Sequence, residues 1–209
     1  GLSCNTSLEI LDLSITSMGD SSVIALVDGL RINKTLKCLN LSNNCALSQS
    51  GRAAIERLMG YNVLRELTLA HTEESVGAST FASGLSNNRS LEKLDLQCTF
   101  VDGEGVETFL AVCESLRGNT TLRHLDVGCN GVRLDGVCAT ALKLDAMSLE
   151  TLDLDHNIVT SCGIVALAQG LQGSFTLKLL STMNCVLDDT GLLKLGEALI
   201  SNFSLDVLH

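Results

Sequence analysis

The sequence predicts an α/β solenoid, an elongated stack of similar repeats that each contribute one short strand and one helix. Three observations support this fold class. The pattern L-x-x-L-x-L recurs along the chain at a nearly constant spacing of about 28 residues, and a fixed period of this length is typical of solenoids. The last two leucines of each pattern stand two residues apart, as on one face of a strand. Apolar residues at helical spacing follow the strands.

The repeats run from one end of the chain to the other. Their leading leucines define seven full repeats, which start near residues 8, 36, 64, 91, 122, 149 and 177 of a single leucine-repeat domain covering residues 1–209. Partial repeats stand at both ends, because residues 1–7 align with residues 29–35 and the last strand pattern begins at Leu205. Solenoid ends need polar caps, and neither end shows one. We therefore expect the chain to be a piece of a longer array.

The sixth repeat shows why each unit is predicted to begin with a strand. Leu152 and Leu154 point to one face of the strand, whereas Thr151 and Asp153 are left for the other. Asn157 follows at the ninth position of the repeat, where the chain has to turn. An asparagine at this position can bond the backbone of the neighbouring coil and so form a ladder through the stack.

The second half of each repeat is predicted to be a helix. In the sixth repeat this helix covers residues 160–171, with Thr160 as its N-cap and apolar residues along one face. A glycine recurs near the helix start in six repeats, which indicates a close approach to the neighbouring coil. These glycines are Gly51, Gly77, Gly105, Gly136, Gly163 and Gly191.

Three repeats depart from the pattern. The fourth repeat carries three extra residues, which we expect to lengthen its helix over residues 104–116. In the fifth repeat, Leu142, Leu144 and Met147 shift the helical register, so the sequence does not define where this helix ends. In the seventh repeat, Thr182 stands in place of a core leucine. It predicts either a local weakness or a repacked site.

The charge and hydropathy of the chain limit the kinds of partner that it can bind. The net charge of −10 disfavours nucleic acid as a ligand, because phosphate contacts dominate such binding. No apolar run is long enough to span a membrane, and no signal-peptide pattern opens the chain. We therefore expect no nucleic acid and no membrane partner, and a cytoplasmic location. An acidic chain of this kind favours a basic protein partner or simply solubility.

Cysteines and glycosylation sequons point to different compartments. Nine cysteines without a C-x-x-C pair fit small buried residues in a reducing compartment, among them Cys113 and Cys138 on helices. Six N-x-S/T sequons argue for a secretory route instead. Five of them occupy one structural place, three residues before the first leucine of a strand, so the architecture explains them without glycosylation. These five are Asn5, Asn33, Asn88, Asn119 and Asn202.

Together these features resemble the ribonuclease-inhibitor-like leucine-rich repeat family. The resemblance rests on the strand motif, on G-x-x-x-L-x-x-x-L, on N-x-T-L and on the period near 28, and it covers the whole chain. It implies a leucine-rich-repeat horseshoe with parallel strands on the concave side and helices on the convex side. The family includes ribonuclease inhibitor, Ran GTPase-activating protein and the sensor arrays of NOD-like receptors. Its usual role is protein binding, often through the concave face.

This resemblance leads us to predict a protein–protein interaction module that binds a partner through its concave face. One alternative is a structural arm or scaffold within a larger assembly. Another, by family analogy alone, is a regulator of a small GTPase or the sensor array of a NOD-like receptor. We expect no enzymatic activity, because the chain has no phosphate loop, no H-E-x-x-H and no G-x-S-x-G motif, and we expect no cofactor.

The fifth strand position supplies the predicted contact surface. It holds an aspartate in three consecutive repeats, and like charges directly opposite one another destabilise a sheet. A basic partner would relieve this repulsion, although Asp is also common at this position in the family. Strand alternation is expected to expose the fourth aspartate, Asp155, on the same side. The predicted partner-binding residues are Asp95, Asp126, Asp153, Asp155, Glu66 and His124.

Two further columns of side chains carry alternative interpretations. The second strand position alternates in charge from repeat to repeat except where Lys37 precedes Arg65, which predicts a self-compensating ladder. The eighth position suggests a zinc site. Four consecutive repeats hold His71, Cys98, Cys129 and His156 at this position. His71 and His156 would lie about 14 Å apart on a straight column, whereas zinc ligands lie within about 2.3 Å of the metal. Cys98, Cys129 and His156 are therefore weak candidates, and we expect no metal.

Overall fold

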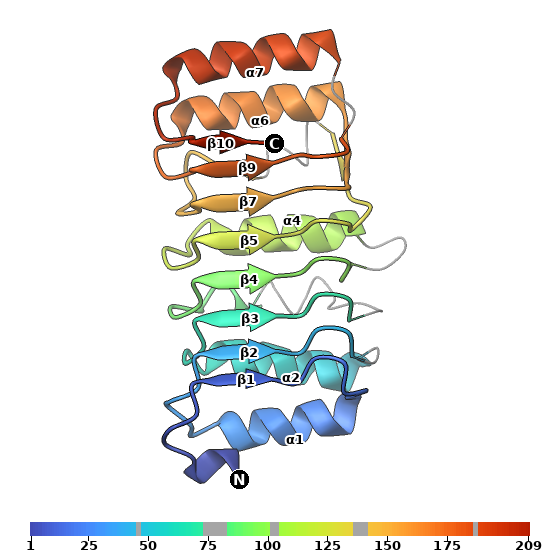
Figure 1. Cartoon of the computed structure of the whole chain (residues 1–209), viewed down its shortest axis with the longest axis vertical. Coiled ribbons are helices and arrows are strands. Elements are labelled where there is room, and N and C mark those ends of the chain that lie inside the picture. The colour runs from blue at the N-terminus through green and yellow to red at the C-terminus, as the bar shows by residue number, and fades with distance from the viewer. Residues whose placement is uncertain (45–46, 73–82, 101–104, 136–141, 186–187) are drawn as a thin grey trace.

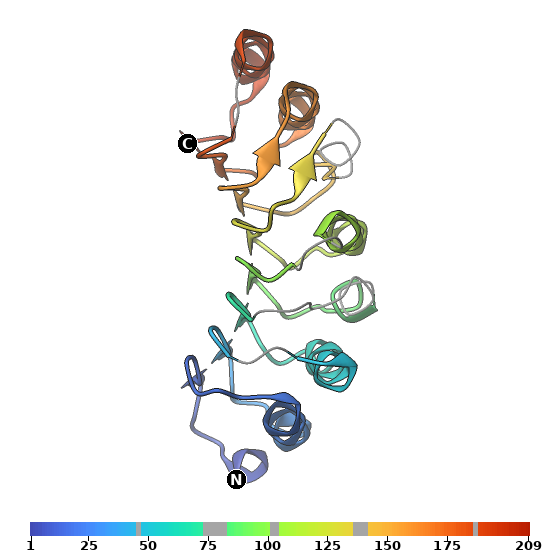
Figure 2. The same cartoon turned by 90° about the vertical axis from the view of Figure 1, so that its right-hand side faces the viewer.

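Parallel strands and helices form two layers along an elongated, curved array (Figures 1 and 2). The computed structural model describes residues 1–44, 47–72, 83–100, 105–135, 142–185 and 188–209. The strands lie on the concave side and the helices on the convex side, as Figure 2 shows. This arrangement confirms the predicted fold class.

One parallel sheet runs the length of the described residues, and its strands follow one another in chain order. Its strands are β1 (Ile10–Asp12), β2 (Cys38–Asn40), β3 (Glu66–Thr68), β4 (Lys93–Asp95), β5 (His124–Asp126), β7 (Thr151–Asp153), β9 (Leu179–Ser181) and β10 (Val207–Leu208). A small second sheet, which the sequence pattern does not predict, pairs β6 (Arg133–Leu134) with β8 (Ile158–Val159). It lies where the chain leaves the turns of the fifth and sixth repeats.

The helical layer follows the predicted stripes of apolar residues. Its elements are the 3-10 helix η1 (Leu2–Cys4) and the α-helices α1 (Asp20–Leu30), α2 (Gln49–Gly60), α4 (Gly105–Leu116), α6 (Ser161–Gly173) and α7 (Asp189–Ser201). The helix expected over 160–171 is confirmed by α6, and Thr160 caps it by accepting a hydrogen bond from Gly163 N. The helix expected over 104–116 is α4 within the described residues, and residue 104 lies outside them. Its described part has 12 residues against 13 in α6 and in α7, so the expected lengthening is not seen there. Cys113 is buried on α4. Cys138, Gly77 and Gly136 lie outside the described residues.

The two irregular repeats near the C-terminus are repacked. In the fifth repeat, residues 142–147 form turns and no helix, and Leu142, Leu144 and Met147 fill the core from these turns. In the seventh, Thr182 is buried and donates a hydrogen bond from Oγ1 to His209 O over 3.0 Å. Of the two readings of Thr182, the structure supports the repacked site.

Central leucines of successive strands stack directly on one another in the core. Leu94 pairs in register with Leu125, and Leu125 with Leu152, and all three are at most 2% exposed. Burying a leucine contributes roughly 1.5–3 kcal/mol. Because every strand is only two or three residues long, this stacking fixes the register, and a slip by one residue would turn each leucine to the concave surface.

Buried asparagines at the ninth position join neighbouring repeats, as predicted. Asn130 donates from Nδ2 to Leu96 O and Val127 O, both over 2.9 Å. Its Oδ1 accepts from Thr99 N and Phe100 N over 2.7 and 2.8 Å. One side chain therefore bonds four backbone groups, of which Leu96 O, Thr99 N and Phe100 N belong to the neighbouring coil.

A second asparagine ladder joins the helix ends, and it explains the repeated sequons. Asn119 is 4% exposed. Its Nδ2 donates to Leu85 O and Asn88 O, and its Oδ1 accepts from Thr121 N and Leu122 N. Asn33, Asn88 and Asn202 use Nδ2 in the same way. The nitrogen that would carry a glycan is engaged inside the fold at these positions.

Candidate protein-binding surface

Three aspartates form a continuous row on the concave face. Asp95 stands opposite Asp126 in the register of β4 and β5, and Asp126 stands opposite Asp153 in the register of β5 and β7. The core-facing leucines lie between them in sequence, so alternation along each strand turns the aspartates away from the core. All three side chains are half-buried. The structure therefore brings together the row that the sequence predicts.

Each aspartate of this row also closes the turn that follows its strand. The Oδ1 atoms of Asp95, Asp126 and Asp153 accept hydrogen bonds from the backbone N–H groups two residues further on, over 3.0, 2.8 and 2.9 Å. Asn40 makes the same bond to Ser42 N over 2.9 Å. In these repeats a side-chain oxygen at this position closes the turn, and an amide supplies it without any charge.

The negative charges of the row oppose one another. Burial and the neighbouring carboxylates of Asp153, Asp95 and Asp155 raise the pKa of Asp126 to about 6, against the lowering effect of its bond from Gly128 N. Burial, together with Asp155 and Asp95, also raises the pKa of Asp153. A carboxylate with a raised pKa gains from any cation that approaches it.

A shallow hollow of about 210 Å³ opens beside the row on the concave face. Asp126 and Asp153 line it together with Lys93, His124 and Thr151. The Nδ1 atom of His124 lies 2.9 Å from Thr151 Oγ1. This hollow places His124 with the aspartates, as predicted. Glu66 lies one strand away on β3, exposed and opposite Lys93 in the register.

The expectation that Asp155 is exposed on the concave side is wrong. Asp155 is 7% exposed, and its Oδ1 accepts hydrogen bonds from Ser181 Oγ and Met183 N over 2.6 and 2.7 Å. Strand alternation ends with β7 at Asp153, and the following turn carries Asp155 inward. It therefore joins the sixth repeat to the seventh instead of facing a partner.

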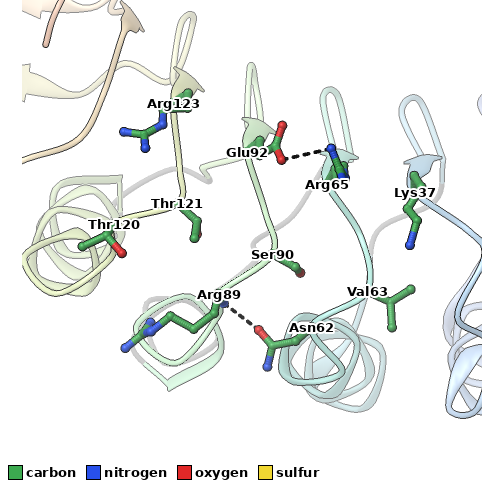
Figure 3. Close-up of a pocket in the computed structure, with 10 residues that line it drawn as sticks. All are labelled: Lys37, Asn62, Val63, Arg65, Arg89, Ser90, Glu92, Thr120, Thr121 and Arg123. Carbon is green, nitrogen blue, oxygen red and sulfur yellow. Dashed lines mark hydrogen bonds and ion pairs between the residues drawn. The ribbon is translucent and has the colours of Figure 1, made fainter.

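A basic cleft lies beside the concave face and was not predicted from the sequence (Figure 3). It is an open cleft of about 470 Å³. Lys37, Arg65, Glu92 and Arg123 line it from the second strand position of four consecutive repeats. The charge ladder at this position is partly formed, since Arg65 lies 3.4 Å from Glu92, and Glu150 lies 4.0 Å from Arg123 and 2.8 Å from Lys178.

A leucine-rich repeat model matches residues 4–27, 33–55, 87–110, 118–139 and 146–168, more than half of the chain. The chain belongs to the leucine-rich repeat family. Its relatives are of the ribonuclease-inhibitor type. Ribonuclease inhibitor from Sus scrofa is 29% identical over 96% of this chain and 44% of its own length. NACHT, LRR and PYD domains-containing protein 4E from Mus musculus is 27% identical over 93% of this chain and 20% of its own length.

The leucine-rich repeats here thus span less than half the length of these curated relatives. Protein phosphatase 1 regulatory subunit 37 homolog from Caenorhabditis elegans is 28% identical over 92% of this chain and 21% of its own length. Among solved structures, leiomodin-1 actin-binding site 2 superposes with a TM-score of 0.55 at 19% identity, over 61% of this chain and 75% of that one. Arrays of this family are protein-binding modules. In the described part of the chain, no helix meets the length and hydropathy of a membrane span.

The eighth position of each leucine-rich repeat has a backbone role that the zinc interpretation overlooks. Its residues all adopt positive φ, between 49° and 59°, at the turn after the strand: Ile15, Asn43, His71, Cys98, Cys129, His156 and Asn184. Burial and the neighbouring Cys129 raise the pKa of the Cys98 thiol to about 11, which disfavours a metal-binding thiolate. Among the described residues, no three His, Cys, Asp or Glu side chains converge as metal ligands would.

Proposed function

We propose that this leucine-rich repeat array binds a basic segment of a partner protein through its concave face. The row of Asp95, Asp126 and Asp153 is the contact, with His124 and Glu66 beside it. One observation carries the proposal: Asp95, Asp126 and Asp153 stand side by side and half-buried in the register of β4, β5 and β7. Burial and the neighbouring carboxylates accordingly raise the pKa of Asp126 to about 6. Asn40 shows that the turn itself does not need the charge. The row thus retains a repulsion that a cationic partner would relieve.

The names of similar proteins support binding to another protein. A ribonuclease inhibitor, a phosphatase regulatory subunit and an actin-binding site are each named for a protein on which they act. The hollow beside Asp126 and Asp153 has room for a side chain, and its carboxylates would meet a lysine or arginine there. Long-range attraction would also steer a basic partner to this face, over the 8–10 Å at which salt screens it.

The test is affinity capture from an extract of the source cell, quantified by mass spectrometry. The bait variant replaces the row with its amides, Asp95→Asn, Asp126→Asn and Asp153→Asn, which keep the turn-closing oxygens. We expect specific proteins with basic segments to be captured by the wild type and lost by this variant.

A matched control bait changes the net charge equally on the convex side, with Asp28→Asn, Glu107→Gln and Glu197→Gln. These three exposed residues lie on α1, α4 and α7, and we expect this bait to capture the same proteins as the wild type. Partners that survive loss of the row but disappear with the convex variant would refute the proposal. That result would favour the structural arm, which uses its helices.

A further inference from the structure

We propose that the basic cleft is a second binding site, which takes an acidic segment of a partner protein in extended form. The ligand chemistry is a run of oxyanions, supplied by glutamate, aspartate or phosphorylated serine side chains. The inference is independent of the concave surface, because the two sites differ in place, charge and partner. The cleft forms where the start of each strand lies beside the end of the preceding helix.

The cleft is positive on a chain whose net charge is −10. Four cations line it, namely Lys37, Arg65, Arg89 and Arg123, against the single carboxylate of Glu92. Arg65 and Arg89 are exposed, while Lys37 and Arg123 are half-buried. Guanidinium groups present several donors in a planar fork that matches carboxylate and phosphate oxygens.

Like charges stand next to each other at the one break in the ladder of alternating charge. Arg65 N donates to Lys37 O over 2.8 Å, so the two residues lie side by side, directly before the adjacent strands β2 and β3. Neighbouring like charges on a sheet destabilise it, and the Lys37 ammonium donates only to Lys34 O among its described hydrogen bonds. An anion between Lys37 and Arg65 would turn this repulsion into two attractions.

Hydrogen-bonding groups line the cleft beside the cations. Ser90 and Thr121 follow the helix ends of the third and fourth repeats, with Asn62 at the preceding helix end (Figure 3). The Asn62 Oδ1 accepts from Arg89 N over 2.6 Å, which fixes the backbone at Arg89. The cleft crosses four repeats, so its length suits a chain of residues carrying several oxyanions.

The direct test is fluorescence anisotropy of the whole chain with three labelled peptides. One places glutamates around a central serine, the second has this serine phosphorylated, and the third has glutamines in place of the glutamates. We expect binding of the two anionic peptides that weakens with salt, and none of the neutral peptide. Whether carboxylate or phosphate binds more tightly then identifies the source of the oxyanion.

Substitutions in the cleft give effects of both signs. Lys37→Gln with Arg65→Gln should weaken the anionic peptides about tenfold. The control variant combines Arg117→Gln, directly after α4, with Lys194→Gln on α7, and neither residue lines the cleft. It removes two positive charges, as the cleft variant does, and should leave the affinity for the peptides unchanged. Glu92→Gln removes the one carboxylate and should tighten binding about threefold, a gain that misfolding does not produce.

Three outcomes would overturn the proposal. These are equal binding of the neutral peptide, equal weakening by the control pair, and tighter binding of a single-stranded oligonucleotide than of either anionic peptide. The last outcome would assign the cleft to nucleic acid instead of protein.

Discussion

The fifth strand position combines a turn requirement with an electrostatic cost. Its side chain closes the turn by accepting a backbone hydrogen bond, whether it is Asp126 or Asn40. Only the aspartates add charge, and burial together with neighbouring carboxylates raises the pKa of Asp126 and of Asp153. Asp12 makes the same turn bond to Ser14 N, but its bonds from Ser14 and Asn40 lower its pKa. The same residue type therefore has opposite pH behaviour at two places in one column.

Asp126→Asn should stabilise the protein at neutral pH. The pKa of Asp126 is raised from 3.8 to about 6, so the folded state binds the proton more tightly than the unfolded state does. Its contribution to stability is full below about pH 4 and is lost as the pH rises through about 6. We expect the variant to gain about 1 kcal/mol in unfolding free energy at pH 7, since solvent screens part of the charge, and nothing at pH 4.

Urea denaturation of both proteins at the two pH values measures this difference. Asp12→Asn is the matched control, because it removes a carboxylate from the same column whose pKa is lowered. It should bring no gain at pH 7. A stabilisation of equal size at Asp12 would show that the effect belongs to the turn and not to the row of charges.

The aspartate row could be predicted from the sequence, whereas the burial of Asp155 and the basic cleft could not. The leucine period fixes the strand register, and this register predicts that Asp95, Asp126 and Asp153 stand in one row on the concave face. The direction of the Asp155 side chain could not be predicted in this way, because alternation ends with the short strand β7 and the following turn sets the direction. The basic cleft was also missed. Arg89 and Lys37 are distant in sequence, and only the packing of helix ends against strand starts brings them together.

At the scale of the helix, glycine sets how closely each repeat packs on its neighbour. A Cβ atom at Gly163 would overlap the carbonyl oxygen of Leu134, whereas one at Gly196 would meet nothing within 4 Å. The recurrent glycine predicts this close approach from the sequence. The sequence does not reveal that residues 142–147 form turns, because buried Leu142 and Leu144 satisfy a helical spacing as well as they fill these turns.

Gly163→Ala should destabilise the protein even though alanine favours helices. The start of α6 has to move away from Leu134, and such overpacking costs about 2 kcal/mol. Gly196→Ala, within α7, should instead stabilise it by up to about 1 kcal/mol. Thermal unfolding of the two variants checks the pair, and a stabilised Gly163 variant would contradict the proposed contact.

The asparagine ladder should be the strongest single link between repeats. Asn130→Ala leaves three backbone groups without their partner, namely Leu96 O, Thr99 N and Phe100 N, while Val127 O keeps its bond from Asn157 Nδ2. We therefore expect a loss of about 3 kcal/mol. Thr72 occupies the same position of another repeat, and its side chain makes one bond within the described residues, from Oγ1 to Leu69 O. Thr72→Ala should cost about 1 kcal/mol. Equal losses in denaturant titrations would show that the ladder does not depend on the amide.

At the scale of the whole molecule, the fold distributes opposite charges over two surfaces. The concave row is acidic, and the cleft at the strand starts is basic, although the chain as a whole carries −10. Net charge alone therefore identifies only one of the two surfaces. The separation follows from the repeat, because each position of the unit builds its own column along the stack.

The association rate of a captured basic partner tests the central claim most directly. We expect the rate constant for the wild type to fall steeply between low and physiological salt, because attraction to Asp95, Asp126 and Asp153 steers the encounter. The variant with all three residues as asparagine should associate about tenfold more slowly at low salt and show little dependence on salt. Equal rates and equal salt dependence for the two proteins would contradict the assignment of the concave row as the contact surface.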